Sequence, residues 1–464
     1  MRTLIALLSL SALALAQQGP QAYVSVQAQV VALTHARVID GAGGPALPDQ
    51  TLVIENGRIA ALAPGAAAPA GAKVLDLSGD TVLPGLVGMH EHMFYPVGNG
   101  LYGEQGYSFP RLYLAGGVTT IRTTGSIEGY ADLNLKREID AGGAVGPEIF
   151  PTAPYLEGFP PLGLQLHPLR DAAEARAFVN YWAGAGADNF KAYMHITPAE
   201  LAAAIAAAHA RGLKLTGHLC SVGFREAAAL GIDDLEHGFV VDTEFVPDKQ
   251  PGQCPAQNLT FATNAKLDIE SPEVQATIHD LIQRHVALTS TLVIFETFVP
   301  NRPPLQNRVL DVLTPEARVQ YLEGRIRTAA NPNSVWPVLF KKEEQFERDF
   351  ARQGGLLLAG LDPTGGGGVV AGFGDQRELE LLVEAGFTPE QAIQIYTQNG
   401  ARYLGIADRV GTIAVGRQAD LIVVRGDPSA RIADIENVVT VFKRGVGYDP
   451  AKLIAAARDS VGMH

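Results

Sequence analysis

The sequence is poor in cysteine, in basic residues and in long apolar runs. Its 464 residues include two cysteines, Cys220 and Cys254, so at most one internal disulfide can form. Lysine and arginine number 36 against 49 acidic residues, and the net charge of -13 gives no support for binding to nucleic acid or to an anionic membrane. We find no nucleophile elbow, phosphate loop or dinucleotide fingerprint, which argues against the enzyme classes that depend on them.

The one long apolar stretch, Leu4 to Leu15, follows Arg2 and ends in the small-x-small pattern Ala14-Leu15-Ala16. This pattern predicts a signal peptide over residues 1–16, cleaved after Ala16, with an uncleaved anchor as the alternative. No later run is long enough to span a bilayer, so the mature protein is expected to be soluble and secreted or periplasmic. Export permits a disulfide between the two cysteines, but the sequence does not give the distance between them and leaves this open.

Residues 83–405 alternate between short apolar or β-branched runs and alanine-rich helical stretches. Hydrophobic residues make up 47% of the chain, as in a globular protein. Repeated strand–helix units predict an α/β fold with a parallel sheet, most simply a (β/α)8 TIM barrel. The expected strands are the run before His90 and residues 118–122, 148–150, 188–191, 213–216, 232–236, 286–292 and 355–359. The long connection 293–353 is interpreted as a lid or specificity loop, or else as a surface insertion.

The two ends of the chain have β character. Asn56-Gly57 lies between two apolar runs and predicts a hairpin, and 409–450 contains further strand-like runs. Neither segment is large enough to fold alone. We therefore expect residues 28–82 and 409–450 to form one composite β domain, a small β-sandwich, beside the barrel.

Chemically active side chains follow the expected strands at the points where these strands end. In a barrel all eight carboxyl ends face one mouth, so residues far apart in sequence meet there. His90 and His92 leave one strand on the same side, as metal ligands would. The sequence predicts a metal site made of six residues: His90, His92, Lys191, His218, His237 and Asp362.

The residue types at this mouth also indicate a chemistry. Two divalent ions can share a water and lower its pKa toward neutrality, and Asp362 can take the proton and pass it to a leaving amine. An ammonium group would be repelled by two cations, so Lys191 fits this place if CO2 converts it into a carbamate that bridges them. The alternative is a lysine that contacts substrate or packs in the core.

With these residues the chain resembles the amidohydrolase superfamily, and more narrowly its imidazolonepropionase-related and prolidase-like metallo-dipeptidases. Gly186-Ala-Asp-Asn-Phe-Lys-Ala-Tyr193, Leu235-Glu-His-Gly238 and 410–420 are similar to motifs of that group. The resemblance implies that His90, His92 and Asp362 bind the more buried ion, and that His218 and His237 bind the other. It further implies a carbamylated Lys191 between them and zinc as the metal.

The sequence indicates the residues that contact the substrate less clearly than it indicates the metal ligands. Tyr193 could polarise the carbonyl, His195 could touch the substrate, and Arg122 could face a carboxylate or form a structural ion pair. The group often has aspartate after this arginine, whereas Thr123 stands here, and its Gly/His-rich segment is replaced by Tyr155-Leu-Glu-Gly-Phe-Pro-Pro161.

The expected function is that of an exported binuclear metal-dependent amidohydrolase. It would cleave an amide or peptide bond of a dipeptide or N-acyl amino acid by attack of a metal-bridging hydroxide. A mononuclear deaminase, a cyclic-amide hydrolase and a lactonase are alternatives, although Ser221 stands where deaminases tend to carry glutamate. A non-catalytic metal- or ligand-binding protein is the alternative from another class. The only partner expected is a small-molecule amide or peptide, with no nucleic acid, and a homo-oligomer is compatible with the sequence.

Overall fold

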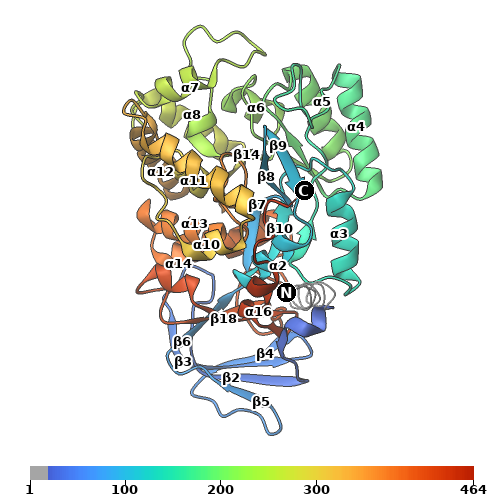
Figure 1. The fold of residues 1–464 in the computed structure, drawn as a ribbon, viewed down its shortest axis with the longest axis vertical. Helices are drawn as coiled ribbons and strands as arrows, with labels where there is room; N and C mark the ends of the chain where they lie inside the picture. The colour runs from blue at the N-terminus through green and yellow to red at the C-terminus, as the bar shows by residue number, and fades with distance from the viewer. Residues whose placement is uncertain (1–18, 464) are drawn as a thin grey trace, which may run out of the picture.

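The computed structural model describes residues 19–463, so the expected signal peptide lies outside the described part of the chain. A body of parallel strands surrounded by helices stands above an antiparallel-rich sheet (Figure 1). In the described residues no helix is both long enough and apolar enough to cross a membrane.

The parallel strands form two sheets, with three strands in the order β11-β10-β7 and five in the order β12-β13-β14-β15-β16. Each coincides with one of the expected apolar runs. Their bounds are β7 (Leu86–Glu91), β10 (Val118–Thr123), β11 (Glu148–Phe150), β12 (Asn189–Ala192), β13 (Lys214–Gly217), β14 (Asp234–Glu236), β15 (Ala287–Ser290) and β16 (Leu357–Ala359).

Backbone hydrogen bonds connect the two sheets at both junctions. Leu156, which follows β11, donates its N–H to the carbonyl of Lys191 in β12, at 2.9 Å. At the other junction Asp362 donates to the carbonyl of His90 in β7, at 3.0 Å. Gly360 makes this approach possible, because a Cβ at this position would lie 2.2 Å from the backbone nitrogen of His90. The eight parallel strands therefore follow one another around a ring.

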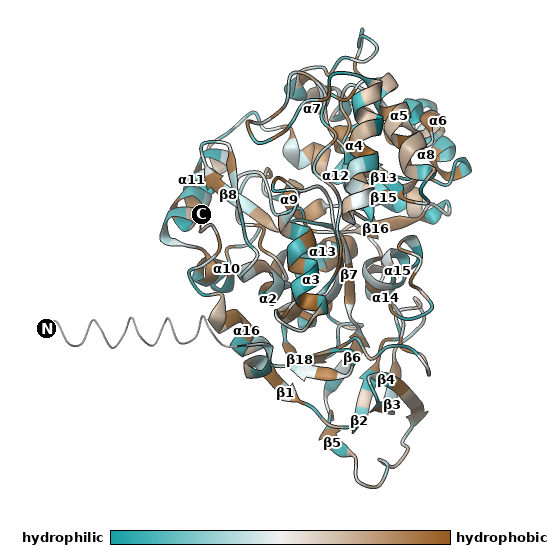
Figure 2. Cartoon of the chain, turned by 90° about the vertical axis from the view of Figure 1, so that its right-hand side faces the viewer, coloured by the Kyte–Doolittle hydropathy of each residue, from teal (hydrophilic) through white to brown (hydrophobic). Residues whose placement is uncertain are grey.

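Helices follow the strands and cover the outside of this ring. In Figure 2, β7 is brown and apolar, whereas the outer helices α3 and α4 carry polar teal segments. The helix α5 begins with a capping box of Thr197 and Glu200, with Pro198 in its first turn, which explains its sharp start. The principal covering helices are α2 (Ser108–Ala115), α3 (Ala131–Asp140), α4 (Ala172–Ala185), α5 (Pro198–His209), α6 (Phe224–Leu230), α8 (Pro272–Gln283), α13 (Phe373–Glu384) and α14 (Pro389–Gln394).

The long connection after β15 is helical rather than a structureless loop. The charged run near its end lies within α12, whose acidic residues Glu343 and Glu347 are buried. The buried residues of α12 show that this helix packs against the body of the protein. The four helices of the connection are α9 (Leu292–Glu296), α10 (Asn307–Val312), α11 (Pro315–Ala329) and α12 (Trp336–Arg352).

Strands from both ends of the chain form one nine-stranded sheet in the order β1-β19-β18-β17-β6-β2-β3-β4, with β5 paired to β2. The Asn56-Gly57 hairpin joins β3 to β4, as expected. Hydrogen bonds connect the two terminal segments, because β17 pairs with β6. The blue N-terminal strands and the dark red β18 accordingly lie together in Figure 1. The bounds are β1 (Val24–Val26), β2 (Val30–Val38), β3 (Leu47–Glu55), β4 (Arg58–Pro64), β5 (Lys73–Asp76), β6 (Asp80–Pro84), β17 (Leu421–Arg425), β18 (Val438–Lys443) and β19 (Val446–Tyr448).

A second hairpin was not expected from the sequence. It consists of β8 (Phe94–Gly98) and β9 (Leu101–Glu104), which pair antiparallel directly after the histidines of β7. At the other end of the chain, α16 (Pro450–Ala456) leads into a segment that returns to this region. There the N–H of Gly462 donates to the side chain of Gln105. The β8–β9 hairpin and the segment after α16 thus both lie beside the carboxyl end of β7.

Candidate active site

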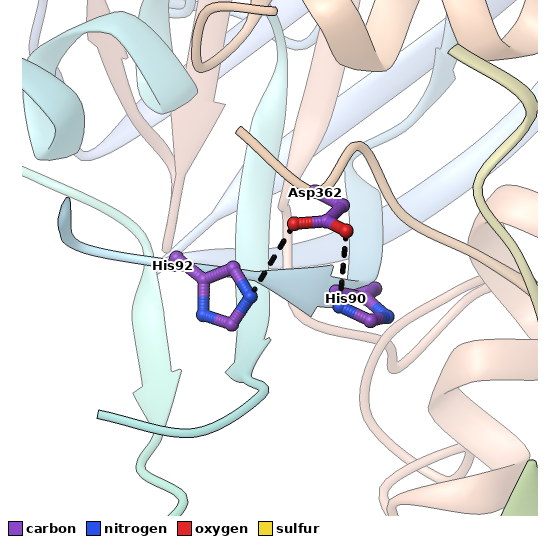
Figure 3. A group of neighbouring side chains, drawn as sticks. All are labelled: His90, His92 and Asp362. Atoms are coloured by element: carbon purple, nitrogen blue, oxygen red, sulfur yellow. Dashed lines mark ion pairs between the residues drawn. The ribbon is translucent and has the colours of Figure 1, made fainter. Parts of the chain in front are cut away.

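His90, His92 and Asp362 meet where β7 and β16 end. His90 Nε2 lies 3.8 Å from Asp362 Oδ2, and His92 Nε2 lies 3.6 Å from Asp362 Oδ1. One carboxylate oxygen is thus turned toward each imidazole (Figure 3). Ligand atoms of these three residues all lie within 4.8 Å of one another, a spacing that can hold a metal ion.

The other three predicted ligands lie beside this group. His237 Nε2 is 3.8 Å from Asp362 Oδ2, and the ring centroids of His218 and His237 are 4.4 Å apart. Lys191 Nζ lies 3.1 Å from His90 Nε2, between the two sets of histidines in sequence and buried with them. The structure therefore brings all six predicted residues to one place.

Hydrogen bonds fix the orientation of three of the imidazole rings. The Nδ1 atom of each is bonded to a fixed acceptor: Glu236 Oε2 for His90 at 2.6 Å, the Gly125 carbonyl for His92 at 3.2 Å, and Thr291 Oγ1 for His237 at 2.8 Å. Their Nε2 atoms consequently face the shared space. His237 Nε2 and Asp362 Oδ1 are buried there without a hydrogen-bond partner. Anchored imidazoles, one of them with an unpaired inner nitrogen, together with an unpaired carboxylate oxygen, fit divalent metal ions.

Two of these residues have an unusual backbone conformation. His237 has φ of 73° and Asp362 has φ of 49°, both in the left-handed region that residues other than glycine rarely adopt. His237 directly follows β14, and Asp362 lies three residues after the end of β16. Such conformations cost free energy and are concentrated at functional sites.

Burial sets the protonation of the site. It lowers the pKa of His218 to about 3, and it holds the pKa values of His90, His92 and His237 well below the usual range, with Lys191 adding to the effect. Neutral imidazoles are the form that binds metal. Burial also lowers the pKa of Lys191 to about 8, and a neutral amine is the form that reacts with CO2. The pKa of Asp362 is raised to about 6, again by burial.

Residues 81–446 match the Amidohydrolase family. The chain belongs to the amidohydrolase family. This confirms the resemblance drawn from the strand-end residues.

Curated relatives match this amidohydrolase over short stretches. A dihydroorotase of Pelobacter propionicus is 41% identical over 91 residues, which cover 19% of this chain and 20% of that protein. An imidazolonepropionase of an Arthrobacter species is 34% identical over 111 residues, which cover 24% of this chain and 26% of that protein. The chain thus spans about a fifth to a quarter of the length of these relatives.

Solved structures match it over nearly its whole length. A putative prolidase from Bifidobacterium longum shares 26% identity with a TM-score of 0.65, covering 90% of this chain and 94% of that one. A Xaa-Pro dipeptidase with methionine bound in its active site has a TM-score of 0.67 at 22% identity, covering 90% of this chain and 100% of that one. At this identity the second comparison shows a shared fold.

Arg122 does not face the substrate space of this amidohydrolase. It is fully buried beneath the histidines, where its guanidinium binds Asp234 Oδ2 at 2.7 Å and Glu236 Oε1 at 2.8 Å. The structural ion pair, the other interpretation of Arg122, is therefore what the structure shows. Asp234 and Glu236 were missed from the sequence. Their spacing of two residues on one strand, which places both on the same face, was the available signal.

Two hollows open at the site. One, of about 340 Å³, is lined by His218, His237 and Asp362 together with residues of α9, α12 and α7 (Gln257–Asn264). The other, of about 180 Å³, is lined by Tyr193 and by residues of the β8–β9 hairpin. The predicted contact Tyr193 thus borders a cavity, and its ring lies 5.2 Å from that of His218. His195 lines neither hollow, and its backbone N–H donates to Glu157 at 2.7 Å.

The two cysteines form a disulfide, which the sequence had left open. It ties the loop before α7 to Cys220, two residues beyond His218. Cys220 itself lines the larger hollow, as do Gln257, Thr260 and Phe261 of α7. The bridge therefore fixes one wall of that hollow.

Proposed function

We propose that this amidohydrolase cleaves the amide or peptide bond of a small molecule with two divalent ions, most simply zinc. His90, His92 and Asp362 would hold one ion, and His218 and His237 the other. Lys191, as a carbamate, would lie between them. The observation that carries the proposal is the convergence of six strand-end side chains whose inner atoms have room for metal. Dipeptides and N-acyl amino acids are the first substrates to test.

Bound metal would supply a water of lowered pKa and would polarise the substrate carbonyl. Asp362 is placed to accept a proton from that water and to donate it to the departing nitrogen. Asp362 Oδ1 is buried without a hydrogen-bond partner and is therefore available to accept that proton. Tyr193, at the edge of the hollow, would orient the carbonyl. The anchors behind His90, His92 and His237 keep these rings from turning during the reaction.

We also propose a domain organisation and a cellular location for the protein. The ring of parallel strands supports a (β/α)8 barrel over residues 83–405, with residues 28–82 and 409–450 as the composite β domain. A secreted or periplasmic location is proposed from residues 1–16, and the disulfide is compatible with it.

A mononuclear deaminase is the second candidate. Within the described chain the only group of ligand atoms that is mutually close enough for one ion is the set of His90, His92 and Asp362. That compact set would suffice for a single metal, and Lys191 would then have no bridging role.

Metal content per chain distinguishes the two. Mature protein supplied with zinc and bicarbonate is expected to hold two ions, and Lys191→Ala fewer. Lys249→Ala is the matched control, because Lys249 donates to the Ser221 carbonyl and is not a predicted ligand. One ion in both wild type and Lys191→Ala would refute the lysine bridge and favour the mononuclear enzyme. No bound metal in any sample would refute the metal site itself.

A further inference from the structure

Four aromatic side chains form part of the wall of the larger hollow. Trp336 stacks on Phe298 with ring centroids 4.7 Å apart and on Phe295 at 5.7 Å, and Phe261 lies 4.9 Å from it. Phe295 in turn lies 5.6 Å from His237. We call the part of the hollow bordered by these four residues the aromatic lobe. It is continuous with the metal site and suits a flat or bulky apolar group.

The smaller hollow is lined by uncharged residues, mostly apolar and aromatic. Tyr102, Tyr155 and Tyr193 line it together with Phe94 and apolar loop residues. Burial raises the pKa of Tyr102 to about 12, so its hydroxyl stays neutral at physiological pH. We call this hollow the tyrosine lobe. Thr364 borders both lobes, so one substrate can extend from one into the other past Asp362.

Among residues 19–463, no lysine or arginine lines either lobe. Arg122 binds Asp234 and Glu236 beneath the site, and Arg377 binds Glu296. Lys191 Nζ lies 5.5 Å from the ring centroid of Tyr155 and 5.8 Å from that of Tyr193, and as the proposed carbamate it would carry no positive charge. The metal ions would face the scissile amide. A free carboxylate on either substituent would therefore lose its hydration without gaining a counter-charge, which is costly.

We propose that the substrate is an amide with no free carboxylate, with an aromatic or bulky apolar substituent in the aromatic lobe and an uncharged substituent in the tyrosine lobe. This inference rests on the proposed amide hydrolysis and narrows it. Of the expected dipeptides and N-acyl amino acids, the structure favours derivatives whose carboxylate is blocked, together with simple aryl amides.

A matched pair of amides tests the charge requirement. N-(4-methylphenyl)benzamide and 4-(benzoylamino)benzoate differ only by a methyl group against a carboxylate at the same ring position. With zinc-loaded protein, kcat/KM for release of the aryl amine is expected to be roughly tenfold or more higher for the neutral amide, because the buried carboxylate is unpaired. Equal values, or a preference for the carboxylate, would overturn the inference while leaving amide hydrolysis supported.

A binding measurement keeps the inference testable if neither amide is hydrolysed, an outcome that would count against the proposed function. The chain has two tryptophans, and Trp182 lies in α4 against Tyr130 and Tyr181, outside both lobes. In Trp182→Phe protein, fluorescence reports on Trp336 alone. The neutral amide is expected to change this fluorescence at concentrations roughly tenfold lower than the carboxylate. Equal affinities would overturn the inference.

Adding a cation to the larger hollow should cancel most of the preference for the neutral amide. Gln257 borders the larger hollow and is exposed, so its substitution leaves the fold intact. Gln257→Arg is expected to raise affinity for 4-(benzoylamino)benzoate relative to the neutral amide by roughly tenfold. Gln257→Met carries a similar change in side chain without charge and should keep the wild-type preference. The same shift in both variants would show that charge does not govern selection.

Discussion

The Nδ1 atom of His90 lies 2.6 Å from Oε2 of Glu236, and neither side chain is exposed to solvent. The other oxygen of Glu236 binds Arg122, whose second partner is Asp234. A buried charge network thus lies directly behind a histidine that we propose as a metal ligand. It fixes which nitrogen of His90 faces the site and strengthens that nitrogen as a ligand.

Glu236→Gln is expected to lower metal affinity by about 10–100-fold, because His90 loses the carboxylate behind it. Asp234→Asn is the matched control, since it also removes a charge from Arg122 but does not touch a histidine. Both variants should lose stability, by about 1.5–3 kcal/mol, because each weakens one hydrogen bond to the charged guanidinium of Arg122, which keeps its other carboxylate. Competition with a chelator measures the affinities, and an equal loss in the two variants would show that the effect comes only from destabilisation.

Asp362→Asn is expected to lower kcat by about 10²–10⁴-fold, because an amide cannot carry the proton to the leaving nitrogen. Asp362 is also a proposed ligand, so bound zinc must be measured in the same samples used for kinetics. Activity should fall much further than metal content. A decrease in activity that only matches the loss of zinc would assign Asp362 to binding alone.

Removal of the disulfide, by Cys220→Ala with Cys254→Ala, is expected to lower the free energy of unfolding by about 2–4 kcal/mol. The bridge closes a loop between positions 34 residues apart, and its loss frees the unfolded chain. KM should rise because α7 forms one wall of the larger hollow, whereas kcat should change little. Denaturant unfolding and steady-state kinetics test this, and a reducing agent should affect wild type but not the double variant.

Glu104 should make stability depend on pH. Burial raises its pKa to about 9, and neighbouring Asp132, itself raised to about 7, adds to the effect. The folded protein therefore binds more protons than the unfolded chain between about pH 4.5 and 9, so the free energy of unfolding falls as pH rises through this window. Glu104→Gln should show a shallower decline from pH 5 to pH 8 in denaturant titrations. An unchanged slope of stability against pH would show that Glu104 is not the source of the pH dependence.

Most of the parallel strands could be predicted because each is an apolar run between helical stretches. The β8–β9 hairpin was missed, although its turn, Asn99-Gly100, is the same dipeptide that revealed the hairpin at Asn56-Gly57. Helix boundaries within 293–353 could not be predicted, since their amphipathic faces are defined only by the body against which they pack.

The sequence by itself determined which side chains meet at the site. In a ring of parallel strands every carboxyl end faces one mouth, so strand positions alone place His90, His92, Lys191, His218, His237 and Asp362 together. Only the tertiary structure decided that Arg122 lies beneath the site and that Trp336 walls it. These contacts join elements far apart in the chain, and their geometry depends on packing that no local pattern records.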